Sequence, residues 1–340
     1  MTFTFAVYYC PVNKNSKEGM KMLKKVIKSV IGISMATAIG FSLVGCGDAG
    51  RTGSGNPPTS ANTPAANATA PATTAPEEIA TSGQITVITR EDGSGTRGAF
   101  VEVVDITVGD NDGITEEAVV QPGTGAMLTA VAGDPLAIGY ASTGRALTDD
   151  RVKVLAIDGV MPTVENMLNG TYAIQRPFII GYNTAAGLSP TAQDFVDFIF
   201  SAQGQEVVAR EGYVPFVPEG APQFAPSGLT GTIVVNGSSS VYSLMGHLSE
   251  AYRELNPNVR IDIHGAGTGH GISAVRDGIA DIAMSSRDLR ESELEFMTPL
   301  TIGIDGIAVI VHPTSSVDSL TLEQVRNIFL GSVDRWENMR

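Results

Sequence analysis

The sequence has little cysteine, histidine and tryptophan, with two cysteines, four histidines and one tryptophan in 340 residues. Both cysteines, Cys10 and Cys46, lie near the start, so the chain after them can form no disulfide and no cysteine-rich metal site. The four histidines show no paired spacing of metal ligands. The sequence therefore predicts no bound metal and gives no sign of a cofactor.

Basic residues are also scarce, because 22 lysines and arginines face 36 aspartates and glutamates and leave a formal net charge of −14. Binding of nucleic acid needs a basic surface, so this balance argues against it. The same balance gives no long-range attraction to an anionic ligand. Any bound anion must be held by short hydrogen bonds in a desolvated cleft.

Long apolar runs are absent apart from one near the start. Four lysines precede an uncharged, mostly apolar stretch from Ser29 to Gly45, which ends in Leu43-Val44-Gly45-Cys46. The stretch is short for a membrane-spanning helix and has the form of a bacterial lipoprotein signal. We expect residues 1–45 to be the signal peptide and Cys46 to carry a lipid that anchors an extracytoplasmic protein to the membrane. An uncleaved membrane anchor is the alternative.

Residues 46–83 contain almost no bulky apolar side chain and are rich in Thr, Ala, Pro, Gly, Ser and Asn. Such a segment cannot bury enough surface to fold, so it is predicted to be a disordered tether. The chain that follows is long enough for two compact lobes. Its short β-branched runs alternate with amphipathic helical patterns, which predicts the α/β class. The predicted strands are Ile85–Thr89, Ala137–Ala141, Val152–Ile157, Phe178–Tyr182, Thr232–Asn236, Arg260–His264 and Ile302–His312, and the predicted helices are Thr191–Ser201, Gln203–Glu211, Ser240–Asn256 and Thr321–Phe329.

Two glycine-rich turns have the build of an oxyanion cradle. The segment from Arg90 to Arg97, REDGSGTR, follows an apolar run and precedes the helix-like stretch Gly98–Val104. A helix that begins there presents free N–H groups and its positive dipole end to a ligand, beside hydroxyl groups and one guanidinium. The turn Gly265–Gly271 precedes a second helical stretch in the same way. Two such turns predict one anion held between two lobes.

Six longer segments closely resemble the phosphate-binding proteins of bacterial phosphate ABC importers. They are REDGSGTRGAF at 90–100, AIGYAS at 137–142, RPFIIGY at 176–182, GSSSVYSL at 237–244, ADIAMSSRDL at 280–289 and DGIAVIV at 305–311. The resemblance implies a two-lobed fold of the periplasmic-binding-protein type (type II), with a cleft between the lobes. It also implies a monomer without catalytic activity, which captures inorganic phosphate and delivers it to the permease of the importer.

The order of these segments departs from that of the resembled family, in which the counterpart of 231–340 comes first and that of 84–218 second. The halves are exchanged here and joined by the Pro/Gly-rich connector at 217–230, so we expect a circular permutant, with a fragment of a tandem protein as the alternative. The resemblance then implies one lobe built from 84–177 plus 310–340 and a second from 178–309. The connections between them would be Arg176–Tyr182 and Ile307–His312.

The resemblance also implies which residues bind phosphate. They are Arg90, Ser94, Gly95, Thr96, Ser239, Ser240, Thr268 and Ser286, most of them short donors at helix starts, where a plain N-cap is the alternative role. Asp92 is the expected partner of Arg90. Selection of phosphate over sulfate needs an acceptor for the phosphate proton, and we expect Asp305 in this role, with Asp288 as the alternative.

Four other functions have to be compared with the residues of this sequence. Gly93–Gly98 also fits the G-x-G-x-x-G turn of dinucleotide-binding enzymes, but the acidic residue expected about 20 residues later at the end of a strand is missing. Hydrolysis with Ser94 as nucleophile lacks the G-x-S-x-G elbow and a His–Asp pair. Binding of another tetrahedral anion, namely sulfate, molybdate or tungstate, remains open, as does a phosphate-sensing lipoprotein without a transport role.

Overall fold

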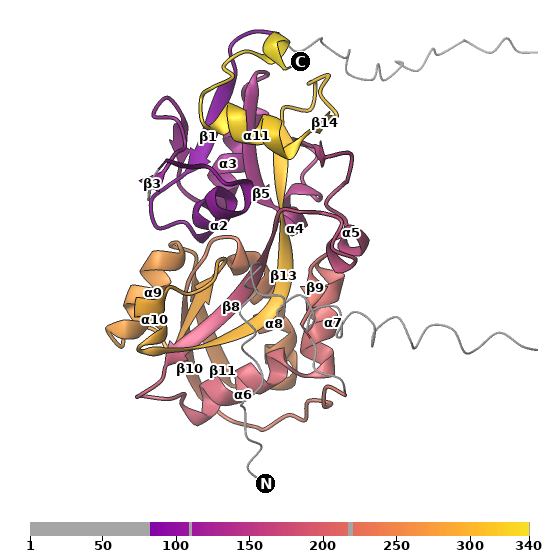
Figure 1. Ribbon diagram of the computed structural model, residues 1–340. Coiled ribbons are helices and arrows are strands. Elements are labelled where there is room, and N and C mark those ends of the chain that lie inside the picture. Colours follow the sequence, from indigo (N-terminus) through magenta and orange to yellow (C-terminus); the bar gives the residue numbers. More distant parts are fainter. Residues whose placement is uncertain (1–81, 109–110, 217–219, 340) are drawn as a thin grey trace, which may run out of the picture.

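The computed structural model describes residues 82–108, 111–216 and 220–339, which form the two stacked lobes of Figure 1. The expected signal peptide, the lipidation site Cys46 and most of the expected tether lie outside these residues. Among the described helices, none is long and apolar enough to cross a membrane.

The first lobe contains the described residues from 82 to 174 and from 307 to 339, and the second lies between them. The elements of the first are β1 (Thr86–Arg90), α2 (Gly95–Val104), β2 (Thr107–Val108), β3 (Asn111–Asp112), β4 (Val119–Gln121), α3 (Gly123–Ala132), β5 (Ala137–Ser142), α4 (Thr143–Ala146), β6 (Lys153–Val154), β7 (Ala156–Ile157), α5 (Val164–Leu168), β14 (Ser319–Leu320), α11 (Leu322–Phe329) and the 3₁₀ helix η1 (Trp336–Asn338). Those of the second are α6 (Pro190–Ile199), α7 (Ala202–Arg210), β9 (Val214–Pro215), β10 (Gly231–Gly237), α8 (Val241–Leu255), β11 (Val259–His264), α9 (Thr268–Arg276), β12 (Ile282–Ser285) and α10 (Glu291–Leu294).

Two long strands, β8 (Gln175–Asn183) and β13 (Met297–Val311), connect the lobes. The sheet order is β11-β10-β12-β8-β13-β5-β1-β4, with β6 and β9 paired to β13 outside this path. β13 pairs with β8 over residues 297–306 and with β5 over residues 307–311. One strand therefore belongs to the sheets of both lobes.

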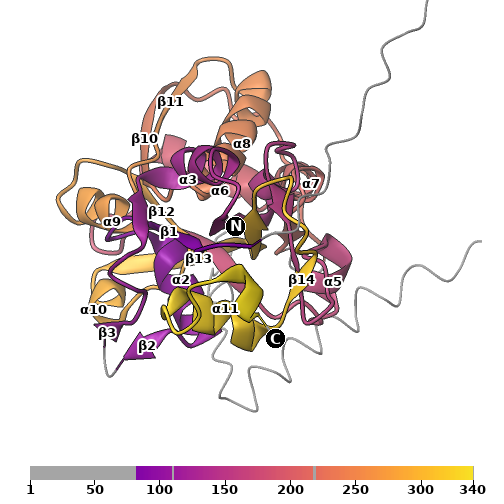
Figure 2. The ribbon, with the colours of Figure 1, turned by 90° about the horizontal axis from the view of Figure 1, so that it is seen from above.

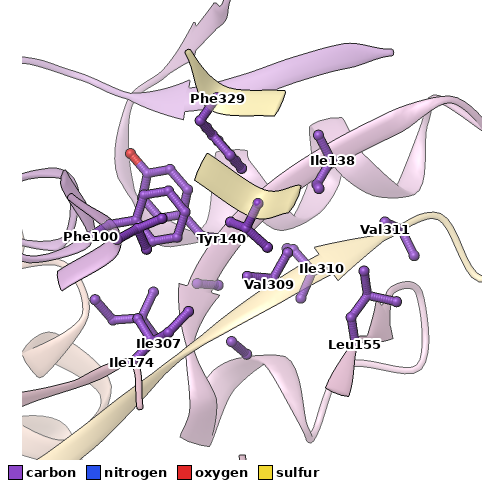
Figure 3. Close-up of a cluster of buried hydrophobic side chains, with 14 of the residues drawn as sticks. Phe100, Ile138, Tyr140, Leu155, Ile174, Ile307, Val309, Ile310, Val311 and Phe329 are labelled. Carbon is purple, nitrogen blue, oxygen red and sulfur yellow. The ribbon is translucent and has the colours of Figure 1, made fainter. Parts of the chain in front are cut away.

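Apolar side chains bury separately in each lobe. One core cluster gathers residues from Ile85 to Ile174, Val214 and residues from Ile307 to Trp336, and a second gathers residues from Phe178 to Ile302. In the first cluster, drawn in Figure 3, the ring of Phe100 stacks on Tyr140 at 4.1 Å and meets Phe329 edge-on at 4.8 Å. Helix α11, near the end of the chain, thus packs against helix α2, near the start of the folded part, and Figure 2 shows the two helices side by side.

The two ends of the folded part lie side by side. The amide of Ile85 donates to the carbonyl of Asp334 at 2.7 Å, and the amide of Trp336 donates to the carbonyl of Gly83 at 3.0 Å. The indole N–H of Trp336, which is 4% exposed, donates to the carbonyl of Leu136. The last described residues therefore complete the lobe that contains β1.

The expected elements are present with shifted ends, and several others were not expected. Caps explain the helix starts: Ser189 and Ser201 accept backbone N–H bonds before α6 and α7, and Thr321 forms a capping box with Gln324. The strand expected at Val152–Ile157 is instead two short strands, β6 and β7, with different partners, β13 and β14. Helix α3 and strand β4 were not predicted from the sequence, and together they position Thr124 at the candidate site.

Candidate functional site

Four helix N-termini converge where the two lobes meet. Each lobe supplies two adjacent parallel strands, β1 and β4 from the first and β10 and β11 from the second. Each strand leads through a short turn into a helix, namely α2, α3, α8 and α9. Ligands of open α/β sheets bind beyond the carboxyl ends of such strands, and helix N-termini favour anions.

Hydroxyl groups from the two lobes bond to one another across this junction. The hydroxyl of Thr96, at the start of α2, lies 2.8 Å from that of Ser240, at the start of α8. The hydroxyl of Thr124 lies 3.2 Å from that of Ser240 and 3.4 Å from that of Ser239. Thr96, Thr124 and Ser240 are all at least 96% buried. The junction is therefore a desolvated cluster of groups that can either donate or accept.

Gly95 allows the lobes to approach at the first glycine-rich turn. A Cβ added there would lie 2.7 Å from Oγ of Ser286 and closer still to the hydroxyl of Thr268, both on the other lobe. Beside it, the amide of Gly269 donates to the carbonyl of Gly93 at 3.1 Å. Only a residue without a side chain fits between the lobes at this place.

Arg90 supplies the cation of the site and is only 1% exposed. Its Nη2 donates to Oγ of Ser239 across the junction at 3.0 Å, and its Nη1 approaches the hydroxyl of Thr124 at 3.5 Å. Its partner is not Asp92, as expected, but Glu91, whose two oxygens accept from Nε and Nη2 at 2.7 Å each. Asp92 is fully exposed and pairs with Arg97 instead, because the turn directs it to solvent.

Glu91 and Arg90 form a two-point ion pair at the rim of the junction. Burial raises the pKa of Glu91, but the hydrogen bonds and charge of Arg90, together with the amide of Gly123, more than offset this and lower the pKa overall. Glu91 is therefore ionised at neutral pH and fixes the plane of the guanidinium.

Ser94, Thr268 and Ser286 are the remaining expected residues: Ser94 caps a helix of the first lobe, and the other two are buried in the second lobe. Ser94 is the N-cap of α2, where its hydroxyl accepts from the amide of Arg97 at 3.3 Å. Thr268 and Ser286 are fully buried in the second lobe, and the hydroxyl of Thr268 accepts from the amide of Ser286. The structure thus brings together Arg90, Ser94, Gly95, Thr96, Ser239, Ser240, Thr268 and Ser286 at one junction.

Two residues of the junction, Thr124 and Ser238, were not predicted from the sequence. Thr124 lies in the segment Gln121-Pro122-Gly123-Thr124-Gly125, a third glycine-rich turn between a strand and a helix that could have been recognised by its similarity to the other two. Ser238 adjoins the expected pair Ser239 and Ser240, and its Oγ donates to Oγ of Ser286 at 2.8 Å.

Asp305 lies next to the junction but is engaged elsewhere. Its Oδ2 accepts from Nε and Nη2 of Arg176 at 3.1 and 2.8 Å, and its Oδ1 accepts from the hydroxyl of Ser142 and the amide of Thr143. A carboxylate has about four acceptor positions, so this set uses them all. The geometry does not support the expectation that Asp305 accepts the phosphate proton, because no lone pair is left for it.

The ion pair of Arg176 and Asp305 joins the two connecting strands, since Arg176 is on β8 and Asp305 is on β13. Both side chains are at most 1% exposed. Burial raises the pKa of Asp305, which Arg176 and the other donors oppose, and burial lowers the pKa of Arg176. Nη1 of Arg176 also donates to the carbonyl of Ser286 at 3.4 Å, so the ion pair is directly connected to a residue of the junction.

A groove of about 790 Å³ adjoins the junction on its outer side, between α2 of one lobe and α9 and α10 of the other. Its lining includes Arg97, Arg276, Arg287 and Arg290. Arg287 is held by both oxygens of Glu293, at 2.7 and 2.8 Å. No group of three metal-ligating side chains occurs among the described residues.

Comparison with known proteins gives a consistent result. The sequence matches the PBP superfamily domain over residues 59–203 and 223–339. It is 37% identical over 325 residues to phosphate-binding protein PstS 2 of Streptococcus pneumoniae. The matched region covers 94% of this chain and 100% of that protein. The chain belongs to the PstS-like phosphate-binding proteins.

Two further members of this family are similar over most of the folded part. PstS 2 of Streptococcus agalactiae is 39% identical over 76% of this chain and 88% of its own length. The crystal structure of a phosphate-binding protein of a phosphate ABC transporter from Streptococcus pneumoniae is 40% identical, covers 76% of this chain and 100% of its own, and superposes with a TM-score of 0.61. The resemblance seen in the sequence and the α/β fold of the binding-protein type are thereby confirmed.

Proposed function

We propose that this protein binds one inorganic phosphate ion between its two lobes and serves as the extracytoplasmic receptor of a phosphate ABC importer. The observation that carries the proposal is the convergence of four helix N-termini, Arg90 and a buried cluster of hydroxyl groups at the interlobe junction. Donors from both lobes can reach one tetrahedral anion there. The cluster contains no paired nucleophile and base, so binding without turnover is the function that it supports.

Titration calorimetry of the purified protein tests this proposal directly. We expect one phosphate ion per chain, no release of product from phosphate esters, and a more compact particle in small-angle scattering as the lobes close on the ion. Tighter binding of molybdate, tungstate or sulfate than of phosphate would contradict the proposal and assign the site to another oxyanion.

Attachment to the membrane is part of the same proposal. A signal peptide at 1–45, a lipid on Cys46 and a tether to residue 83 would hold the lobes near a permease in the same membrane. The form of the segment Leu43-Val44-Gly45-Cys46 supports this. If this protein binds phosphate but contacts no permease, the sensing role is favoured instead.

We also propose that the chain is a circular permutant of the common family order, with lobes formed by 84–177 plus 310–340 and by 178–309. Direct contacts between the two ends of the folded part support it, because Gly83 and Ile85 bond to Trp336 and Asp334. Ends this close can be exchanged by cutting a surface loop elsewhere.

A variant whose two segments are placed back in the common family order, called the rejoined chain, tests the permutation. It would begin at Thr230, run to residue 340, continue through a short Gly/Ser linker into Gly83 and end at Leu229, which keeps the contacts of the connector, such as those of Phe224 with Gln203 and of Ser227 with Asn256. We expect it to fold and to bind phosphate with unchanged affinity, because the described contacts within both lobes are kept. A rejoined chain that does not fold, beside a folded parent, would show that the present order is required and would contradict the permutation.

A further inference from the structure

Arg176 links the two long connecting strands to the candidate site. It lies on β8, and its Nε and Nη2 donate to Oδ2 of Asp305 on β13 at 3.1 and 2.8 Å. Its Nη1 donates to the carbonyl of Ser286 at 3.4 Å. Ser286 belongs to the junction, because a Cβ added to Gly95 of the other lobe would lie 2.7 Å from its Oγ. A single residue therefore separates the guanidinium of Arg176 from the surface where the lobes meet.

The positive charge of Arg176 is permanent and poorly screened by solvent. An arginine side chain keeps its proton in proteins, and this one is only 1% exposed. Burial is the largest cause that lowers the pKa of Arg176; Asp305 opposes it, and the charge of Arg90 adds to it. The two guanidinium groups are thus within electrostatic reach of each other. An anion bound by Arg90 would then also feel the charge of Arg176.

Asp305 places the opposite charge beside Arg176. Its side chain is 0% exposed, and it accepts from the hydroxyl of Ser142 and the amide of Thr143 as well as from Arg176. These donors favour the ionised form of the carboxylate. The field that the pair produces at the junction is the difference between two buried charges of opposite sign. Removal of either charge leaves the other one uncancelled.

We propose, on the basis of the proposed function, that Arg176 is a positioning residue of the phosphate site, which strengthens anion binding from behind Ser286, and that Asp305 limits this effect by cancelling most of its charge. The pair sets how tightly the anion is held without touching it. An uncancelled second guanidinium would bind the anion more tightly and release it more slowly.

Calorimetric titration of Asp305→Asn with phosphate tests this inference. Asparagine keeps the size of the side chain and an oxygen that accepts from Arg176, but it removes the negative charge. We expect phosphate to bind about fivefold more tightly or better than in the parent protein. Urea denaturation of the same variant should show lower stability, because Arg176 is left buried without a counter-ion. Tighter binding together with lower stability is a result that a purely structural ion pair would not give.

Asp277→Asn is the matched control, since it removes the same charge from an arginine–aspartate pair at the surface. The side chains of Arg276 and Asp277 are 57% and 51% exposed, so solvent screens both. Phosphate affinity should not change in this variant. A gain equal to that of Asp305→Asn would show that the net charge of the protein matters and not the buried pair.

Two substitutions of Arg176 keep the test decisive if Asp305→Asn does not fold. Arg176→Gln leaves the charge of Asp305 uncancelled and should weaken phosphate binding about tenfold or more. Arg176→Lys keeps the positive charge without the planar fork and should stay within about threefold of the parent. Equal losses of affinity in the two variants would overturn the inference.

The outcomes separate this inference from the proposed function. Absence of phosphate binding by the parent protein would reject the proposed function itself. Phosphate binding by the parent that is unchanged or weakened in a folded Asp305→Asn would reject the role of the ion pair alone.

Discussion

Replacing Gly95 with alanine is expected to lower phosphate affinity by about 100-fold or more. The added methyl group would lie 2.7 Å from Oγ of Ser286 and would overlap the hydroxyl of Thr268. Both neighbours are short, fully buried side chains on the opposite lobe, so they cannot move aside. The lobes would have to stay apart, and calorimetric titration with phosphate measures the loss.

Gly98→Ala is the matched control, because it changes the same helix one turn later. A Cβ there would meet only Cδ of Arg287, at an ordinary distance of 3.5 Å. Alanine also favours a helix interior over glycine, so this variant should bind phosphate normally and be no less stable. Normal binding by Gly95→Ala would show that the lobes do not close on the ligand in the described arrangement.

Replacing Arg176 with leucine is expected to lower the free energy of unfolding by about 3–5 kcal/mol. The variant leaves Asp305 charged and unpaired at a position that is 0% exposed. The loss should be measured by urea denaturation at neutral pH. Arg151→Leu removes a mostly exposed arginine from its pair with Asp149 and should change stability little, which makes it the control.

The destabilisation of Arg176→Leu should depend on pH in a defined direction. Burial raises the pKa of Asp305, and Arg176 opposes that rise in the parent protein. Without Arg176 the folded state therefore holds the proton more tightly than the unfolded state does. The variant should lose stability as pH rises through the folded-state pKa of Asp305 and recover at lower pH. A loss that does not vary with pH would show that packing, and not the buried charge, dominates.

Much of the fold followed from the sequence because its strands are short β-branched runs and its helices begin at recognisable caps. Ser189, Ser201 and Thr321 each cap a predicted helix. Strand β4 was missed because it has three residues and its two valines are exposed, which leaves no pattern of burial to detect. Helix α3 was missed with it.

The site could be predicted where chemistry is local and not where it depends on strand pairing. The turn at 93–96 carries its own glycines, hydroxyls and helix start, so its residues were found. Asp305 was correctly placed in the interior, but its partner Arg176 is 129 residues away and is set beside it only by the register of β8 and β13. The choice between Glu91 and Asp92 depends on how the chain turns after β1, which the residue order alone does not fix.

The continuous course of β13 through both sheets limits how the lobes can move. Any rotation between them must be absorbed by backbone torsions where β13 passes from its pairing with β8 to its pairing with β5, at Gly306 and Ile307. Gly306 has little free space around it, because Thr143 and Met167 lie beside it, the sulfur of Met167 only 2.8 Å from where a Cβ would be. The lobes are therefore expected to open by a twist of the shared strands and not by a swing about a free loop.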